Sequence, residues 1–216
     1  MIPSFPLARV KSIALLRYFA AGAGMLCLVN CRRTPDPELP ASLSLENWGV
    51  EVVALRHVRA ASGEDFTVPV PGARATVLVF SSTTCPIANG YAPELTRLAN
   101  EFGPRGVTLM LVQTETDITG EKARQHADEY HLAMTVLLDP SHELAKAARA
   151  KITPEAVVLS PSGGVLYRGR IDDRFPDVGL NWREPQHTEL RDALNAILAG
   201  EIVPVKRTEA KGCFIE

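Results

Sequence analysis

The chain has 216 residues, of which 46% are hydrophobic and 22% are charged, and its net charge is −2 at pH 7. Because positive and negative side chains are interspersed, we expect no basic surface for nucleic acid. The sequence also has no internal repeat and no low-complexity tract, which excludes repeat architectures.

The first 31 residues have the pattern of an export signal. A positive leader is formed by Arg9, Lys11 and Arg17. The apolar run that follows, 19–29, is too short to span a membrane and suits a secretory signal. Leu28–Cys31 is similar to a bacterial lipobox in which Cys31 would be lipidated, although Asn30 stands where a small residue is usual. We expect export to the periplasm or cell envelope, with lipid attachment at Cys31, plain cleavage or an uncleaved anchor as alternatives.

Three further segments follow the signal. Residues 32–47 are rich in proline and charge, which predicts an extended linker. Residues 48–200 are long enough to bury the core of one domain. Residues 201–216 form a C-terminal tail that carries Cys213.

The domain begins with strand signals. Residues 50–58 alternate in part between apolar and polar side chains, and Ser62–Asp65 offers a turn, so a short hairpin is expected. Thr76–Phe80 is a continuous apolar run, which is typical of a central strand covered on both faces.

Cys85 follows this strand at the expected start of a helix. Ser81–Thr84 reads as a turn, Cys85 and Pro86 come next, and a helical pattern begins at about Ala88. Unpaired N–H groups and the helix dipole favour a thiolate at such a position, and proline suits the first turn because its missing N–H is no loss there. The pattern predicts a reactive thiol with a lowered pKa. A buried structural cysteine is the alternative.

Strands and helices alternate through the rest of the domain. Helices are expected at 91–102, 119–130 with Thr119 as N-cap, 142–150 and 186–199; strands are expected at 107–113, 134–138, 156–160 and 165–169. The last two strands flank Pro161–Gly164, which reads as a hairpin turn. Alternating elements with a closing hairpin indicate an α/β domain with a mixed sheet.

Pro154 stands just before a buried strand, where proline is normally excluded. A cis bond between Thr153 and Pro154 would turn the backbone sharply and expose Thr153 beside a neighbouring loop. A trans proline that caps the strand is the alternative.

The positions of the four cysteines limit the redox chemistry that the domain can perform. Cys27 and Cys31 lie in the expected signal, so the mature domain holds only Cys85 and Cys213. Two cysteines in an exported protein usually form a disulfide or work as a redox pair. A bond across their 128 positions (213 minus 85) could stabilise the fold by about 4–5 kcal/mol in the chain-entropy treatment. A domain of this size does not require such a bond.

The order of these strands and helices, with a cysteine at a helix start and Thr-Pro before the last hairpin, resembles the thioredoxin-like superfamily. Within that superfamily the chain resembles the redoxin branch, which is the alkyl hydroperoxide reductase/thiol-specific antioxidant family. The resemblance spans roughly 48–200 and rests on Phe80–Leu95, Ile152–Leu159 and Leu166–Asp173. It implies a thioredoxin-like fold, in which helices flank a central mixed β-sheet. It also implies that Cys85 is the reactive cysteine and that Thr153-Pro154 is the cis-proline facing it.

Departures from the family patterns limit the implied activity. Thioredoxins carry Cys-x-x-Cys, but Ala88 occupies the second place, which excludes dithiol exchange within the motif. Peroxiredoxins carry Pro-x-x-x-Thr/Ser-x-x-Cys; Ser82 fits the hydroxyl position, whereas Leu78 replaces the proline. Arg170 is the candidate for the arginine that this family places beside the thiolate. Sco-type copper chaperones need Cys-x-x-x-Cys, and Asn89 occupies that second place.

The resemblance also gives Cys213 a role. Two-cysteine peroxiredoxins have a resolving cysteine near the C-terminus, and Cys213 lies beyond the last helix. A flexible tail could bring it to a sulfenic acid or mixed disulfide at Cys85, and Gly212 would help the tail bend.

Other residues give weaker signals. Asp172, Asp173 and Asp177 could bind a cation, but a solvated turn is expected. The five histidines share no ligand spacing, so no metal or other cofactor is expected. Trp48 and Trp182 are interpreted as packing residues.

The leading hypothesis is an exported redoxin in which the Cys85 thiolate attacks a disulfide or a hydroperoxide. Tyr91, Ser82 and the first N–H groups of the helix would shape the pocket. Cys213 would then close a disulfide, which an external thiol/disulfide electron donor protein would reduce. One alternative is a copper-binding or chaperone module in which both thiols hold Cu(I). The other is a non-catalytic domain with a permanent Cys85–Cys213 disulfide.

Overall fold

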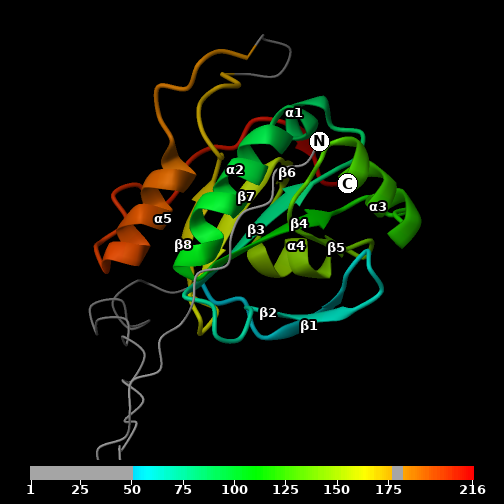
Figure 1. Ribbon diagram of the computed structural model, residues 1–216, viewed down its shortest axis with the longest axis horizontal. Helices are drawn as coiled ribbons and strands as arrows, with labels where there is room; N and C mark the ends of the chain where they lie inside the picture. The colour runs from blue at the N-terminus through cyan, green and yellow to red at the C-terminus, as the bar shows by residue number, and fades with distance from the viewer. Residues whose placement is uncertain (1–50, 177–181) are drawn as a thin grey trace, which may run out of the picture. The chain divides into compact units, whose positions relative to one another are not determined.

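A five-stranded mixed β-sheet lies at the centre of the domain (Figure 1). The computed structural model describes residues 51–176 and 182–216, so the expected signal, Cys31, the linker and Trp48 lie outside the described residues. In spatial order the strands are β5 Thr135–Leu138, β4 Val107–Gln113, β3 Ala75–Ser81, β7 Glu155–Leu159 and β8 Val165–Gly169. β3, β4 and β5 are parallel, whereas β7 and β8 each pair antiparallel with their neighbours. The predicted α/β fold with a mixed sheet is confirmed.

The side chains of β3 divide between two hydrophobic clusters, one on each face of the sheet. Val77 and Val79 pack into one cluster, and Leu78 and Phe80 pack into the other. Successive side chains of a strand point to opposite faces, so a strand covered on both faces needs the continuous apolar run that the sequence shows. All seven residues of β3 are buried.

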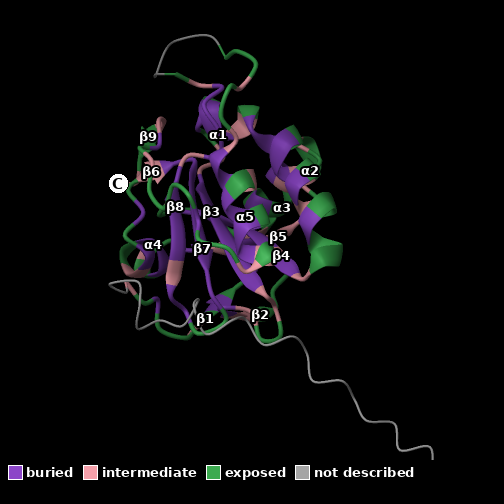
Figure 2. Ribbon diagram, turned by 90° about the vertical axis from the view of Figure 1, so that its left-hand side faces the viewer, coloured by how far each residue is buried: buried purple, intermediate pink, exposed green. Residues whose placement is uncertain are grey.

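Helices cover both faces of the sheet (Figure 2). One face packs against α2 Ala92–Phe102, α3 Gly120–Glu129 and α5 Glu189–Ala199. The other packs against α4 Glu143–Ala148 and the hairpin of β1 Arg56–Arg59 and β2 Asp65–Val68. Two short segments flank α2, namely α1 Pro86–Gly90 and the 3-10 turn η3 Gly103–Arg105. Within the described ranges no helix is long and apolar enough to cross a membrane.

Helix α5 begins three residues later than the sequence predicts. The backbone N–H groups of Gln186 and His187 donate to Oδ1 of Asp173, at 2.7 and 3.0 Å. Because these donors are bound to a side chain of another segment, the residues form a connection rather than the first turn of α5. Helix α3 begins as expected, with the Thr119 hydroxyl accepting from the Lys122 N–H at 3.2 Å.

The C-terminal segment 201–216 differs from the expected flexible tail because it is bound to the domain along its length. The Arg168 N–H donates to the Lys206 carbonyl at 3.0 Å, and the Thr208 N–H donates to the Arg168 carbonyl at 3.1 Å. The segment then forms β9 Cys213–Phe214, which pairs antiparallel with β6 Ile152–Thr153. Neither of these two-residue strands was predicted from the sequence. Each forms its backbone pairing with the other strand, which lies far away in the sequence.

Candidate active site

Cys85 lies where the expected strand-to-helix junction placed it, as the N-cap residue of α1 with Pro86 at the first position. Its carbonyl accepts from the Asn89 N–H at 3.0 Å, which closes the first turn. The side chain is only 1% exposed. The thiol is therefore covered by other parts of the chain, and the residues that cover it define the site.

The Thr153–Pro154 loop faces this thiol. The peptide bond between the two residues is cis, and the Cys85 Sγ donates to the Thr153 carbonyl at 3.1 Å. The Thr153 side chain is also buried and donates to the Cys213 carbonyl at 3.4 Å. Thr153 thus contacts both cysteines.

Strand β9 brings Cys213 to Cys85. Cys213 is the register partner of Thr153, whose carbonyl accepts from the Cys85 Sγ, and both cysteines are free thiols. A Cβ on Gly212 would lie 1.9 Å from the Thr153 carbonyl oxygen, which is backbone and cannot yield. Glycine at 212 is therefore needed for the close approach of β9 to β6, rather than for bending of a free tail.

The two thiols have opposite pKa shifts. Burial alone would raise the pKa of Cys85, but hydrogen bonds from the Cys213 side chain, the Ala88 N–H and the Thr153 side chain bring the pKa below its usual value. Burial, followed by the hydrogen bond to Cys85 and the charge of Cys85, raises the pKa of Cys213 to about 11. Cys85 is thus the more readily ionised thiol of the pair.

Ser82 lies on the loop before Cys85, but its hydroxyl is engaged elsewhere. It donates to Oε1 of Glu115 at 3.1 Å and shares a hydrogen bond with the Thr84 hydroxyl at 3.0 Å. The Thr83 N–H also donates to this carboxylate oxygen. Glu115 thus holds the loop in place. The sequence reasoning missed Glu115 because it lies 30 positions from Cys85 (115 minus 85) and belongs to no family motif.

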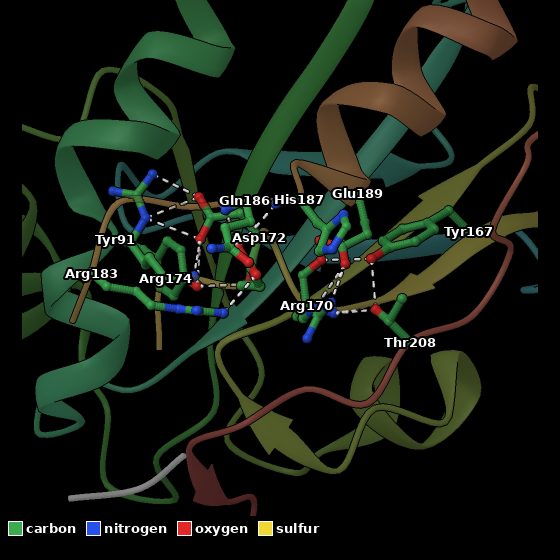
Figure 3. A network of polar contacts seen from close by, with 11 residues as sticks. Tyr91, Tyr167, Arg170, Asp172, Arg174, Arg183, Gln186, His187, Glu189 and Thr208 are labelled. Atoms are coloured by element: carbon green, nitrogen blue, oxygen red, sulfur yellow. Dashed lines mark hydrogen bonds and ion pairs between the residues drawn. The ribbon is translucent and has the colours of Figure 1, made fainter. Parts of the chain in front are cut away.

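The structure does not bring Arg170 to the thiol. Its Nε donates to Glu189 at 2.9 Å, and its backbone N–H donates to the Thr208 hydroxyl at 2.9 Å (Figure 3). The groups that shift the pKa of Cys85 are neutral hydrogen-bond donors and include no arginine. The expected arginine beside the thiolate is therefore not supplied by Arg170, because the carboxylate of α5 binds its guanidinium.

The acidic loop after β8 is a buried ion-pair network rather than a solvated turn. Asp172 and Asp173 are each 3% exposed. Asp172 binds Arg174 and accepts from the Tyr91 hydroxyl at 2.9 Å, whereas Asp173 binds Arg183 (Figure 3). These arginines neutralise both carboxylates, which explains their burial. Tyr91 therefore fixes this loop, and Asp177 lies outside the described residues.

Two further expectations can be compared with the structure. Trp182, interpreted as a packing residue, is 62% exposed. Among the residues that the structure describes, no group of three or more His, Cys, Asp or Glu side chains could hold a metal ion.

A groove of about 400 Å³ opens beside Cys213. Its lining combines hydroxyl groups, carboxylates and the last strand: Ser82, Thr84, Thr114, Glu115, Thr116, Asp117, Thr153, Cys213, Phe214, Ile215 and Glu216. Phe214 is 78% exposed. Cys213 thus lies in a polar groove that is open to solvent, whereas Cys85 does not line it.

A mixed sheet flanked by helices, with a thiol at a helix start that faces a cis-proline, is the arrangement of a thioredoxin-like domain. The profile of the AhpC/TSA family matches residues 55–168, and the chain belongs to this family. The protein is thereby placed among thiol-dependent oxidoreductases.

Solved structures show the same fold. An uncharacterized conserved protein from Geobacillus kaustophilus is 27% identical, with a TM-score of 0.68, and the match covers 77% of this chain and 90% of that chain. A hypothetical protein from Sinorhizobium meliloti 1021 is 24% identical, with a TM-score of 0.68 and coverage of 77% and 92%. A candidate thiol:disulfide interchange protein, DsbE from Chlorobium tepidum, is 14% identical, with a TM-score of 0.56 and coverage of 69% and 96%. No curated protein matches the chain.

Proposed function

We propose that this protein is a thiol-disulfide oxidoreductase that cycles between a Cys85/Cys213 dithiol and a Cys85–Cys213 disulfide. The observation that carries the proposal is the pairing of β9 with β6, which brings Cys213 beside Thr153, the residue whose carbonyl the Cys85 thiol contacts. A thiolate beside a second thiol is the arrangement that intramolecular disulfide formation requires.

Cys85 is the nucleophile of the pair, because its pKa is lowered while that of Cys213 is raised. In one cycle the substrate disulfide accepts two electrons and two protons and leaves as two thiols. The protein is left with a Cys85–Cys213 bond, which a thiol/disulfide electron donor protein reduces. Attack by Cys85 on a bulky substrate would require β9 to move, since Cys85 is 1% exposed.

A disulfide is a better substrate for this site than a hydroperoxide. Leu78 stands where peroxiredoxins have proline, Arg170 is bound to Glu189, and the Ser82 hydroxyl is bound to Glu115. The site therefore lacks fixed, charged donors beside Cys85 for a peroxide oxygen. Direct comparison of turnover with a small disulfide and with hydrogen peroxide tests this preference.

Single cysteine variants test the proposed function. Cys85→Ser is expected to reduce disulfide turnover by about 100-fold or more, because the nucleophile is lost. Cys213→Ser is expected to stop at a mixed disulfide on Cys85, detectable as an added mass on the peptide that contains Cys85. Full turnover by Cys85→Ser, with both variants folded by circular dichroism, would contradict the proposal.

The two alternatives have distinct outcomes. One-to-one binding of Cu(I) by the reduced protein, tight enough to resist a competing chelator, would support a copper module. A reduction potential below the range of catalytic pairs would support a permanent disulfide.

We propose, from the sequence pattern, that the protein is exported and is attached to the membrane at Cys31. Cell fractionation should find the wild-type protein with the envelope, and Cys31→Ser should release it into the periplasm. Wild-type protein in the cytoplasm would contradict export.

A further inference from the structure

The two sulfurs of the pair differ in access. Cys85 is 1% exposed beneath β9, whereas Cys213 is exposed on β9 itself. A partner sulfur can therefore reach Cys213 from solvent without any movement of the backbone. Reaching Cys85 would require β9 to leave β6, which is closely packed through Gly212 and the Thr153 carbonyl.

The groove beside Cys213 is lined by carboxylates and by no cationic side chain among the described residues. Glu115, Asp117 and Glu216 contribute carboxylates, and the groove lining includes no lysine or arginine. Lys122, which lies outside the lining, binds Asp117 at 2.6 Å and reduces only part of this charge. In addition, Oε2 of Glu115 is buried and has no hydrogen-bond partner among the described residues, so this carboxylate is not neutralised by a cation at the groove.

We propose that this groove receives a positively charged thiol donor, whose thiolate attacks Sγ of Cys213 rather than Sγ of Cys85 when the Cys85–Cys213 disulfide is reduced. The inference rests on the proposed dithiol/disulfide cycle and names the sulfur and the partner chemistry of that cycle. Phe214, exposed at the groove, offers an apolar surface for the same partner segment.

The exchange balances as two displacement steps. The thiolate of the partner attacks Sγ of Cys213, a bond forms between these sulfurs, the Cys85–Cys213 bond breaks, and Cys85 leaves as thiolate. A second partner thiolate then attacks the partner sulfur of the mixed disulfide, and Cys213 leaves and takes up a proton. The partner dithiol has become a disulfide, and the protein has gained two electrons.

The stability of the displaced thiolate also favours attack at Cys213. Thiol exchange is faster when the displaced thiol has the lower pKa. Attack at Cys213 displaces Cys85, whose thiolate keeps the hydrogen bonds from the Ala88 N–H and the Thr153 side chain, whereas attack at Cys85 would displace Cys213, whose thiolate is disfavoured by burial. Access and leaving-group strength therefore both select Cys213.

Rapid-quench mapping of the wild-type protein tests the site of attack. The oxidised protein is mixed with cysteamine, the mixture is quenched with acid within the first turnover, and the adduct is located by peptide mass mapping. We expect at least about tenfold more adduct on Cys213 than on Cys85, because accessible sulfurs exchange faster. Adduct mainly on Cys85 overturns the inference.

Small thiols of different charge test the partner chemistry. Once rates are corrected for the thiolate fraction of each reagent, cationic cysteamine should react about threefold or more faster than anionic mercaptopropionate at low salt, and added salt should reduce the ratio. Asp117→Asn with Glu216→Gln should bring the ratio towards one. Glu143→Gln is the matched control, since this carboxylate lies on α4 outside the groove, and it should leave the ratio unchanged.

The outcomes separate this inference from the proposed function. If oxidation yields no Cys85–Cys213 disulfide, the proposed function fails. If the disulfide forms but the rates are independent of charge, or the control changes the ratio as much as the groove variant, only the present inference is overturned.

Discussion

At the scale of single residues, the difference between Cys85 and Cys213 arises from their surroundings and not from their chemistry. Burial opposes ionisation at both thiols. Cys85 also receives hydrogen bonds from the Cys213 side chain, the Ala88 N–H and the Thr153 side chain, which favour its thiolate. The same interaction raises the pKa of Cys213, which is the donor.

These shifts predict how the reactivity of Cys85 depends on pH. The rate of alkylation follows the thiolate fraction, so the Cys85 profile should reach its plateau below the pH expected for an ordinary thiol. Cys213→Ala removes a hydrogen-bond donor and should move the profile to higher pH, whereas Cys213→Ser, which keeps a donor, should move it less. Peptide mass spectrometry after timed alkylation measures both profiles, and an unchanged profile in Cys213→Ala would contradict the assignment.

The pKa shifts of the two cysteines also determine how the stability of the reduced protein depends on pH. Because the pKa of Cys85 is lower in the folded protein, its contribution to the stability of the reduced form is present above the unfolded pKa and is lost as the pH falls through the folded pKa. For Cys213 the contribution is present below its ordinary pKa of 9.0 and is lost as the pH rises towards about 11.

At the scale of elements, strand β9 determines whether the two thiols meet. Gly212→Ala should displace β9, because the new Cβ would lie 1.9 Å from the Thr153 carbonyl oxygen and 2.7 Å from the carbonyl carbon. Alkylation of Cys85 in the reduced protein should then become faster by about tenfold or more, as expected if opening becomes easier by about 1.4 kcal/mol. Oxidation to the disulfide should become slower.

Gly103→Ala is the matched control for this variant. A Cβ at Gly103 would meet no atom within 4 Å, and the residue has a negative φ of −53°. The control should leave both rates unchanged. Equal effects of the two substitutions would show that β9 packing does not govern access to Cys85.

Helix α3 offers a prediction at the same scale that concerns stability alone. Thr119→Ala removes the side-chain acceptor for the Lys122 N–H and should lower the free energy of unfolding by about 1 kcal/mol. Urea unfolding measures the change. Thr119→Ser keeps the hydroxyl and should retain most of the stability; an equal loss in both variants would exclude the cap as the cause.

At the scale of the whole domain, a buried ion-pair network joins α2, the loop after β8 and α5. Arg174 binds both Asp172 and Glu94, and Arg191 of α5 also binds Glu94, at 2.9 Å. The Arg174 guanidinium also lies 5.1 Å from the centre of the Tyr91 ring. Since Tyr91 follows α1, the network connects the core to the helix that begins at Cys85.

Arg174→Leu should therefore lower the free energy of unfolding by about 3–5 kcal/mol, because it leaves the buried Asp172 carboxylate without its cation. Arg97→Leu is the matched control: Arg97 also binds Glu94, at 2.8 Å, but its side chain is 64% exposed. Its loss should cost less than about 1 kcal/mol. Denaturant unfolding of both variants measures the difference, and similar losses would contradict the role of burial.

The sequence alone predicted the parts of the domain that depend on local pattern. The apolar run of β3, the N-cap at Thr119 and the junction at Cys85 are each specified by a few adjacent residues, because periodicity and capping act over one or two turns. Local pattern could not predict three other features of the site. These are the pairing of Cys213 with Thr153, the binding of Arg170 by Glu189 and the burial of Asp172. Each depends on a partner from another element, and only the folded chain shows which partners meet.

What the sequence determined by itself was an α/β domain with one thiol at a helix start and one distant thiol near the C-terminus. The tertiary structure decided that both thiols meet at Thr153, which of them is the more readily ionised and which is exposed. The physical reason is that burial, hydrogen bonding and access at Cys85 are set by β6 and β9, two strands of two residues each that have no local signal and form only against each other.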